Sequence, residues 1–465
     1  MQLVAYGAQD IYLTGNPQIT FFKVVYRRHT NFSMESIVQT FSGTAGFGAD
    51  VVATISRNGD LVHRMYLEHS VTFSSVAEDN NYINIVPDYG SNLIKECEIE
   101  IGGQRIDKHY SHWHSVYSQL TEFNPSGAST NWTTSDEDVK STLFNIMSGN
   151  GGAVSTSAAT TYTNNNGAWV CVKDHTGAEG DSAATRIFIP LYFWFCRNPG
   201  LALPLIALQY HEVKIKMTFD DQINLVHNID DASDDVLADN NKSVEAALSD
   251  GTANSVAPTF NLWCDYIYLD TDERRRFAQV SHEYLIEQLQ FQSFSSATMD
   301  INFNHPVKEI IWTDSQWSGL SSDLTAEADT NISTWLPVAD AAAWGGTDAD
   351  KVLKGRVPAT LTGDYKLKLN GHDRFKERDF RYFTRTQVWQ HHTGYGSTIN
   401  ADAIAVYSFA LKPEEHQPSG TCNFSRIDNA QLVGSNSPGT TFNVYAVNYN
   451  VLRIMSGMGG LAYSN

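Results

Sequence analysis

The sequence predicts an all-β protein with two similar domains in tandem, and three observations support this prediction. The chain has 465 residues, which is more than one ordinary domain. Its composition of 12% aromatic and 18% charged residues, with abundant Asn, Thr and Ser, favours strands joined by polar loops. Four short blocks also recur in the same order in both halves, which indicates an internal duplication.

Each block in the first half shares its strand and turn pattern with a block in the second half. The first pair is a polar turn before an apolar strand, and the second is a hairpin. The third is a strand, a Pro/Gly corner and a second strand, while in the fourth the letters TFNLW match TFNVY. In chain order the pairs are residues 55–73 with 301–312, 98–110 with 366–378, 186–219 with 403–432, and 259–263 with 441–445.

The second pair of blocks gives the clearest hairpin signals. Gly102-Gly103 and Asn370-Gly371 tolerate the positive φ of tight primed turns, and the residues before them alternate between apolar and polar. Many short strands with such corners predict sandwiches or barrels. Periodicity alone does not distinguish a jelly roll from other sandwiches.

The duplication divides the chain into an N-terminal arm (1–21), a first domain (22–270), a charged connector (271–282) and a second domain (283–465). The turn formers at 15–17 precede an apolar strand predicted over 19–26, so the first domain should begin after that turn. Polar insertions at about 121–185, 220–258 and 315–363 are expected to be exposed loops, which a barrel tolerates.

Charge and cysteine content exclude several classes of protein. Lys+Arg 32 and Asp+Glu 52 give a net charge of −20, which opposes binding to phosphate backbones and predicts no direct nucleic-acid binding. The cysteines are widely spaced without a C-x-x-C motif, which favours reduced, mostly buried thiols over a zinc site or a disulfide framework. They are Cys97, Cys171, Cys196, Cys264 and Cys422.

The sequence shows neither a secretory signal nor a membrane span. The first residues, MQLVAYGAQD, lack a basic segment and an apolar core. The most apolar segment, residues 187–208, is interrupted by Arg197 and three prolines. It therefore predicts two short buried strands joined by a Pro-Gly corner.

Several long runs of sequence carry a family resemblance that covers nearly the whole chain. They include QLVAYGAQDIYLTGNPQITFFKVVYRRHTNF (2–32), NPGLALPLIALQYHEVK (198–214), FALKPEEHQPSGTCNFSRIDNA (409–430) and NYNVLRIMSGMGGLAYSN (448–465). These runs resemble the major capsid proteins of nucleocytoplasmic large DNA viruses, especially those of phycodnaviruses and marseilleviruses. The departures from the family lie in the insertions.

The resemblance implies a double jelly roll, that is, two tandem eight-stranded jelly-roll barrels with long loop insertions. It implies a homotrimer that acts as a pseudo-hexameric capsomer and tiles an icosahedral virus shell. It further implies contacts with neighbouring capsomers, minor capsid proteins and penton proteins, and an inner side that faces an internal lipid membrane. The protein would then belong to the virion and be assembled in host cytoplasm. Its first-barrel insertions would face outward and its arm would face inward.

We expect no catalytic, cofactor-binding or metal site. The chain lacks G-x-S-x-G, G-x-x-x-x-G-K-[ST] and H-E-x-x-H motifs, so we expect no enzyme activity. His112 and His114, like His391-His392, could ligate a metal from one strand face, but they lack a third ligand at a recognisable spacing.

Two charged runs are expected to be structural. The acidic run at 230–235 does not follow the spacing of a calcium loop and favours a solvated loop. The run Arg274–Arg276 lies among acidic residues and favours salt bridges or an inter-subunit contact over a nucleic-acid patch.

Two alternative functions are a β-sandwich protein that binds or cleaves carbohydrate and a host-attachment protein. Aromatic richness and the many carboxylates motivate the first alternative. The second would be a binding module with the same ancestry. Neither accounts for two full-length repeated domains with unequal loops.

Overall fold

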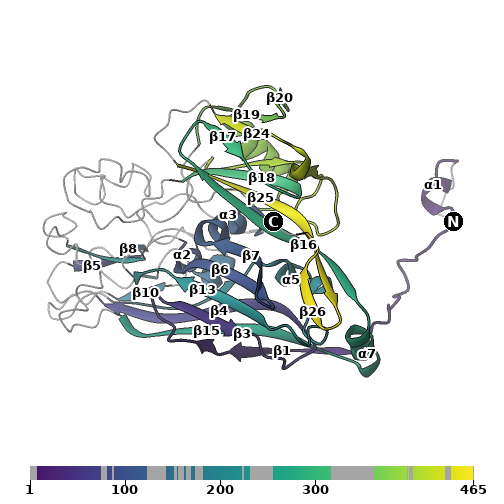
Figure 1. Ribbon diagram of the computed structural model, residues 1–465, viewed down its shortest axis with the longest axis horizontal. Helices are drawn as coiled ribbons and strands as arrows, with labels where there is room; N and C mark the ends of the chain where they lie inside the picture. The colour runs from purple at the N-terminus through teal and green to yellow at the C-terminus, as the bar shows by residue number, and fades with distance from the viewer. Residues whose placement is uncertain are drawn as a thin grey trace, which may run out of the picture.

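The computed structural model describes residues 8–74, 81–85, 88–122, 143–150, 154–155, 162–163, 169–172, 182–222, 225–230, 255–315, 361–394, 396, 402–434 and 441–463. These residues form two consecutive sets of eight main strands (Figure 1). The first set is β1 (Phe32–Gln39), β3 (Asp50–Thr54), β4 (Leu61–Ser74), β6 (Ile94–Ile101), β7 (Gln104–Tyr110), β11 (Ser182–Pro190), β13 (Val213–Phe219) and β15 (Ser255–Leu269). The second set is β16 (His282–Phe294), β17 (Thr298–Ile301), β18 (Pro306–Ser315), β19 (Asp364–Leu369), β20 (His372–Asp373), β22 (Ile404–Ser408), β24 (Ala430–Gly434) and β25 (Thr441–Met455).

The two sets have the same topology. In the first, one sheet has the order β1-β15-β4-β11 and the other contains β3-β13-β6-β7. In the second, the corresponding orders are β16-β25-β18-β22 and β17-β24-β19-β20. Even the short strands β12 (Leu203–Pro204) and β23 (Cys422–Asn423) pair with corresponding partners, β4 and β18. The expected double jelly roll is confirmed.

All four block pairs found in the sequence lie on corresponding strands. The first pair covers β4 and β18, and the fourth covers β15 and β25. The second covers the hairpins β6-β7 and β19-β20, whose turns hold Gly102 and Gly103 at φ 59° and 85° and Asn370 and Gly371 at φ 51° and 79°. The third covers β11 to β13 and β22 to β24. The duplication is therefore structural as well as sequential.

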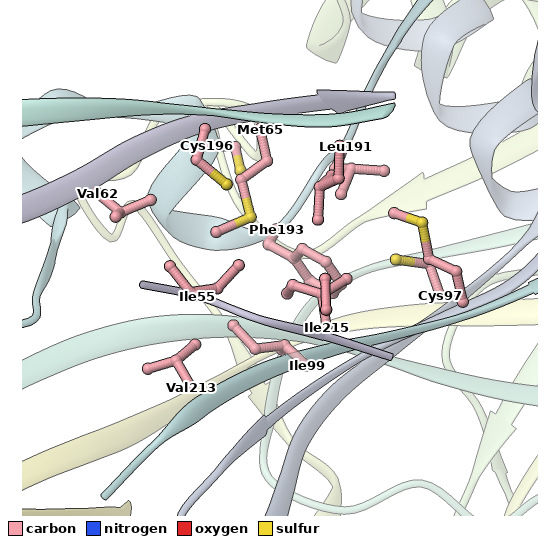
Figure 2. Packing of buried hydrophobic residues seen from close by; sticks show 14 of the residues in the cluster. Ile55, Val62, Met65, Cys97, Ile99, Leu191, Phe193, Cys196, Val213 and Ile215 are labelled. Carbon is pink, nitrogen blue, oxygen red and sulfur yellow. The ribbon is translucent and has the colours of Figure 1, made fainter. Parts of the chain in front are cut away.

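Each barrel has a core made by side chains from its two facing sheets. In β13 the residues Val213, Ile215, Met217 and Phe219 are buried while those between them are partly exposed, which is the period-two pattern of a sheet with one buried face. Figure 2 shows Met65, Ile99, Phe193 and Ile215 meeting in the first barrel. The second core contains Ile310, Trp312, Tyr365, Phe383 and Leu432 among others.

The strand predicted over residues 19–26 is wrong. The first strand begins at Phe32, and the described residues before it contain only the short helix α1 (Ile11–Thr14). Phe21, Phe22 and Tyr26 are 89%, 98% and 86% exposed. An apolar run becomes a strand only where an adjacent strand can bond its backbone, and this stretch extends away from the sheets (Figure 1).

The connector and the apolar segment also differ in part from prediction. Residues of the charged connector form helix α7 (Thr271–Gln279), which is capped because Asp270 Oδ1 accepts a hydrogen bond from the Thr271 backbone N–H at 2.7 Å. The apolar segment begins in β11 as expected, but α5 (Trp194–Arg197) and the 3₁₀ turn η1 (Pro199–Leu201) occupy its middle. Its second strand, β12, has only two residues.

Most of the three predicted insertions lies outside the described residues. Parts of the first insertion that are described include helix α4 (Leu143–Ser148) and strand β10 (Trp169–Val172), which pairs with β11 and widens the sheet. No helix in the described portion of the chain is long and apolar enough to cross a membrane.

Candidate assembly surfaces

Helix α3 (Ser111–Thr121) of the first barrel covers the outer face of the sheet β16-β25-β18-β22 of the second barrel. Its buried residues Trp113, Val116 and Leu120 lie at the spacing that forms one stripe on a helix. The ring centroids of Trp113 and Tyr445 are 5.2 Å apart. The helix and sheet together bury a third apolar cluster, with Tyr192, Ile311, Val388, Ile404, Val406 and Val447 as further members.

Sequence reasoning misses this helix because the alternation in His112-Trp113-His114 favours a strand. On a helix these two histidines do not share a face, so the proposed pairing of ligands fails. The His112 Nδ1 atom lies 2.6 Å from the Tyr445 hydroxyl, in the contact between barrels. His114 is buried, and burial lowers its pKa to about 3. The spacing of Trp113, Val116 and Leu120 is the signal that could have predicted the helix.

A charged network crosses the contact between the barrels. Arg197 Nη1 of the first barrel lies 2.5 Å from Glu287 Oε2 of the second, and the same guanidinium donates to the Tyr117 hydroxyl at 2.9 Å. Lys308 Nζ lies 2.9 Å from Glu287 Oε1, and both side chains are buried. Glu287 therefore holds two cations, one from each barrel.

The network continues to His392, which follows the helix α8 (Gln387–His391). Its Nε2 lies 3.0 Å from Glu309 Oε2 and its Nδ1 lies 2.9 Å from Glu414 Oε1. Burial acts to lower the pKa of His392, but Glu309 and Glu414 outweigh burial and raise this pKa to about 9. At neutral pH the imidazole is therefore a cation.

The two buried carboxylates of the network remain charged. Burial acts to raise the pKa of Glu287, but Arg197 and Lys308 outweigh burial and lower the pKa below its ordinary value. For Glu309 burial acts in the same direction and is outweighed by His392 and Lys308, so this pKa is lowered as well. Paired charges of this kind are costly to separate, because either partner alone would be a buried ion.

Backbone groups along the strand edges complete the contact. The Gln288 side-chain amide in β16 donates to the Ile106 carbonyl in β7, and the Leu289 backbone N–H donates to Asp107 Oδ1 at 3.0 Å. The short strand β26 (Met458–Leu461) also reaches the first barrel, where His211 Nδ1 lies 2.9 Å from the Gly459 carbonyl oxygen. The edge of one barrel thus lies against the edge of the other.

The structure separates the remaining candidate site residues. His391 Nδ1 lies 3.1 Å from the Leu411 carbonyl oxygen, whereas His392 belongs to the charged network. Arg274 makes a salt bridge to Asp60 at 2.8 Å, as expected for that basic run. Residues 231–235 of the acidic run lie outside the described residues. Across the ranges that the structure describes, no group of three or more His, Cys, Asp or Glu could hold a metal ion.

Three of the cysteines have the buried surroundings expected of inert thiols. Cys97, Cys196 and Cys264 are buried and free, and Cys422 is half-buried and free. Burial raises the pKa of Cys196 to about 12, which disfavours the reactive thiolate.

Two groups of exposed apolar side chains lie in and next to β1 in the described part of the chain. The first is the stretch before β1, where Tyr12, Phe21 and Phe22 are at least 89% exposed. The second lies on β1, where Phe32, Met34 and Val38 are 51%, 50% and 46% exposed. Contiguous apolar surface on a folded chain is typical of sites that contact other molecules.

Comparison with known proteins identifies the class to which this double jelly roll belongs. A solved quasi-atomic model of the PBCV-1 virus capsid superposes with a TM-score of 0.66 and 34% identity, over 96% of this chain and 100% of that chain. The Faustovirus major capsid protein shares the fold at a TM-score of 0.60, with 13% identity over 97% of this chain and 94% of that chain. The fold is therefore that of viral double jelly-roll capsid proteins.

The sequence comparisons define the family. Residues 20–270 match the family described as "Major capsid protein N-terminus", and residues 273–460 match "Large eukaryotic DNA virus major capsid protein". The major capsid protein of Pyramimonas orientalis virus is 48% identical over 100% of this chain and 99% of its own length. That of Paramecium bursaria Chlorella virus 1 is 40% identical with the same coverage. The chain belongs to the major capsid protein family of large eukaryotic DNA viruses, whose members are structural proteins of the virion.

Proposed function

We propose that three copies of this chain form a trimer with six similar barrels, and that such trimers tile an icosahedral shell as pseudo-hexameric capsomers. The observation that carries this proposal is the identical strand order of the two barrels, which lie side by side in one chain. A ring built from three duplicated chains approximates a hexagon, and hexagons tile a flat facet.

Sizing of the purified protein by light scattering tests this proposal. The expected mass is three times the 51.7 kDa of one chain. A protein that remains monomeric at micromolar concentration would contradict the trimer and would suit a carbohydrate-binding or host-attachment protein better. Family membership supports the shell function over both alternatives, and the same relationship supports the absence of enzyme activity.

The partners in this proposal are neighbouring capsomers, minor capsid proteins and penton proteins, with the inner side facing an internal lipid membrane. Assembly would take place in host cytoplasm. Family membership supports these contacts, and the exposed apolar stretch before β1 offers a surface for one of them. Pull-down of minor capsid proteins with the full-length trimer and with a trimer lacking residues 1–20 tests that contact.

We also propose the division into an arm (1–21), a first jelly roll (22–270), a connector (271–282) and a second jelly roll (283–465), in which residues 22–31 lead from the arm to the first strand, β1. The position of α7 between β15 and β16 supports the connector. Limited proteolysis should cut first in the arm and leave the two barrels together, because α3 and the charged network join them.

A further inference from the structure

The outer face of the sheet in the second barrel is covered from within the same chain. Helix α3 of the first barrel lies on it, and Tyr445 and Ile311 at its centre are 0% exposed. In the strand register Tyr445 lies between Phe291 of β16 and Ile311 of β18. This row of three residues defines the covered face.

The matching strands of the first barrel present a corresponding row. Trp263 of β15 lies between Val38 of β1 and Tyr66 of β4. Since β1, β15 and β4 correspond to β16, β25 and β18, Trp263 corresponds to Tyr445, Val38 to Phe291 and Tyr66 to Ile311. The two rows therefore occupy equivalent places in the two barrels.

The row in the first barrel is apolar and partly exposed, whereas the row in the second barrel is covered. Val38 is 46% exposed, and Trp263 and Tyr66 are partly exposed. The rings of Tyr66 and Trp263 stack with centroids 6.4 Å apart, and Phe188 of β11 extends the row at 6.1 Å from Tyr66. We call the surface formed by Val38, Tyr66, Phe188 and Trp263 the open face.

The second barrel also has a counterpart of helix α3. Helix α3 follows β7 and precedes β11, and at the same point of the second barrel the chain forms η3 (Tyr382–Thr386) and α8 before β22. Trp113 is the third residue of α3 and is 1% exposed. Trp389 is the third residue of α8 and is 80% exposed. Trp389 therefore packs on little of the single chain, unlike its counterpart Trp113.

We propose that the η3–α8 segment of one copy covers the open face of a second copy, with Trp389 packed against Trp263 and Val38. This inference rests on the proposed trimer and names the surfaces that form it. It repeats between chains the contact that α3 makes within one chain. A head-to-tail contact closes into a ring when the rotation between successive copies closes, and in the proposed trimer three copies complete a ring of six barrels.

The strand edges support the same arrangement. Within the chain, edge strand β16 lies against β7 through the Gln288 side chain and the Leu289 backbone. The counterparts are β1, an edge strand with exposed apolar residues, and the region of β20 and β21 (Arg378–Asp379). Uncovered edges of this type invite unwanted pairing, so a neighbouring copy at β1 would protect it.

The substitution Trp389→Glu tests the proposal through the mass of the protein. A buried interface tryptophan is a typical hot spot, so its replacement by a charge should weaken trimer association by on the order of 30-fold or more. The monomer should remain folded, because Trp389 is 80% exposed in the single chain. The matched control is Leu13→Glu, an 85% exposed residue outside this contact, which should leave the trimer intact.

Cross-linking provides a second, independent test. In the variant Val38→Cys/Trp389→Cys a short bis-maleimide should join different chains into covalent dimers and trimers on a denaturing gel, and neither single variant nor the wild type should do so. The proposed interface would be overturned if Trp389→Glu formed trimers normally, or if trimers of Val38→Cys/Trp389→Cys failed to cross-link. Either result would leave the proposed function standing. A wild-type chain that stays monomeric would overturn both.

Discussion

Glu287 illustrates how much of the contact between the barrels depends on single charged residues. Its carboxylate meets Arg197 from the first barrel and Lys308 from the second, and its side chain is 5% exposed. Hydrophobic burial is insensitive to direction, whereas these ion pairs require particular atoms to meet. The network therefore fixes how one barrel is placed on the other.

The substitution Glu287→Gln is expected to destabilise the folded chain by about 3–5 kcal/mol, because it leaves Lys308 and Arg197 without their buried anion. Thermal unfolding followed by circular dichroism measures this loss. The control is Glu283→Gln in the same strand, where an exposed pair with Arg453 at 2.9 Å should contribute at most about 1 kcal/mol. Equal losses of stability in the two variants would show that the buried network stabilises the chain no more than an exposed ion pair does.

The network should also make stability depend on pH on the alkaline side. The pKa of His392 is raised to about 9 in the folded protein from an ordinary value of 6.5. The stabilisation is therefore fully present below about pH 6.5 and is lost as the pH rises through 9. The melting temperature should fall over this range, and His392→Gln should flatten the fall. A variant with an unchanged pH profile would contradict the assignment.

At the scale of elements, helix α3 and helix α8 hold tryptophans in corresponding places but in opposite surroundings. Trp113 is buried between the barrels, whereas Trp389 is exposed. The tryptophan of α3 therefore stabilises the single chain. In the proposed interface, the tryptophan of α8 contributes only to the contact between chains.

We expect Trp113→Ala to destabilise the isolated chain by about 3–5 kcal/mol, because it opens a cavity between α3 and the second barrel. In a monomeric background, Trp389→Ala should change stability by less than about 0.5 kcal/mol, since the side chain packs on little. Chemical denaturation of both variants measures the difference. If Trp113→Ala is as mild as Trp389→Ala, the third apolar cluster does not hold the barrels together.

The stretch before β1 gives a further prediction at this scale. Deleting residues 1–20 should leave the thermal stability of trimers unchanged, because nearly all described side chains of this stretch are exposed and none belongs to either core. Particle assembly should weaken, since exposed apolar side chains there would lose their partners. Differential scanning calorimetry and electron microscopy of assembled particles measure the two effects. Unfolding of the truncated trimer would show that the arm belongs to the barrel.

At the scale of the whole molecule, the duplication bears on assembly and the net charge bears on nucleic-acid binding. Two barrels of one topology allow a single chain to fill two neighbouring places in a shell. The net charge of −20 opposes binding to phosphate backbones, so we expect no direct binding to nucleic acid.

Duplex DNA should therefore bind this protein no better than it binds a generic acidic protein. Fluorescence anisotropy with a labelled duplex near physiological ionic strength measures binding. Salt-sensitive binding at micromolar protein would contradict the charge argument, because counterion release requires a cluster of cationic side chains.

The sequence by itself determined the class of fold, the duplication and the family. Period-two alternation and tight-turn glycines are local properties, so residues 98–110 and 366–378 are recognisable as hairpins from their letters alone. The tertiary structure alone decided which segments have partners. Residues 19–26 have the pattern of a strand but pair with no strand in the described part of the chain. His112 and His114 lie on a helix, and Glu287 meets Arg197 ninety residues away in the chain. Strand pairing and buried ion pairs depend on contacts between distant residues, and local sequence patterns do not specify those contacts.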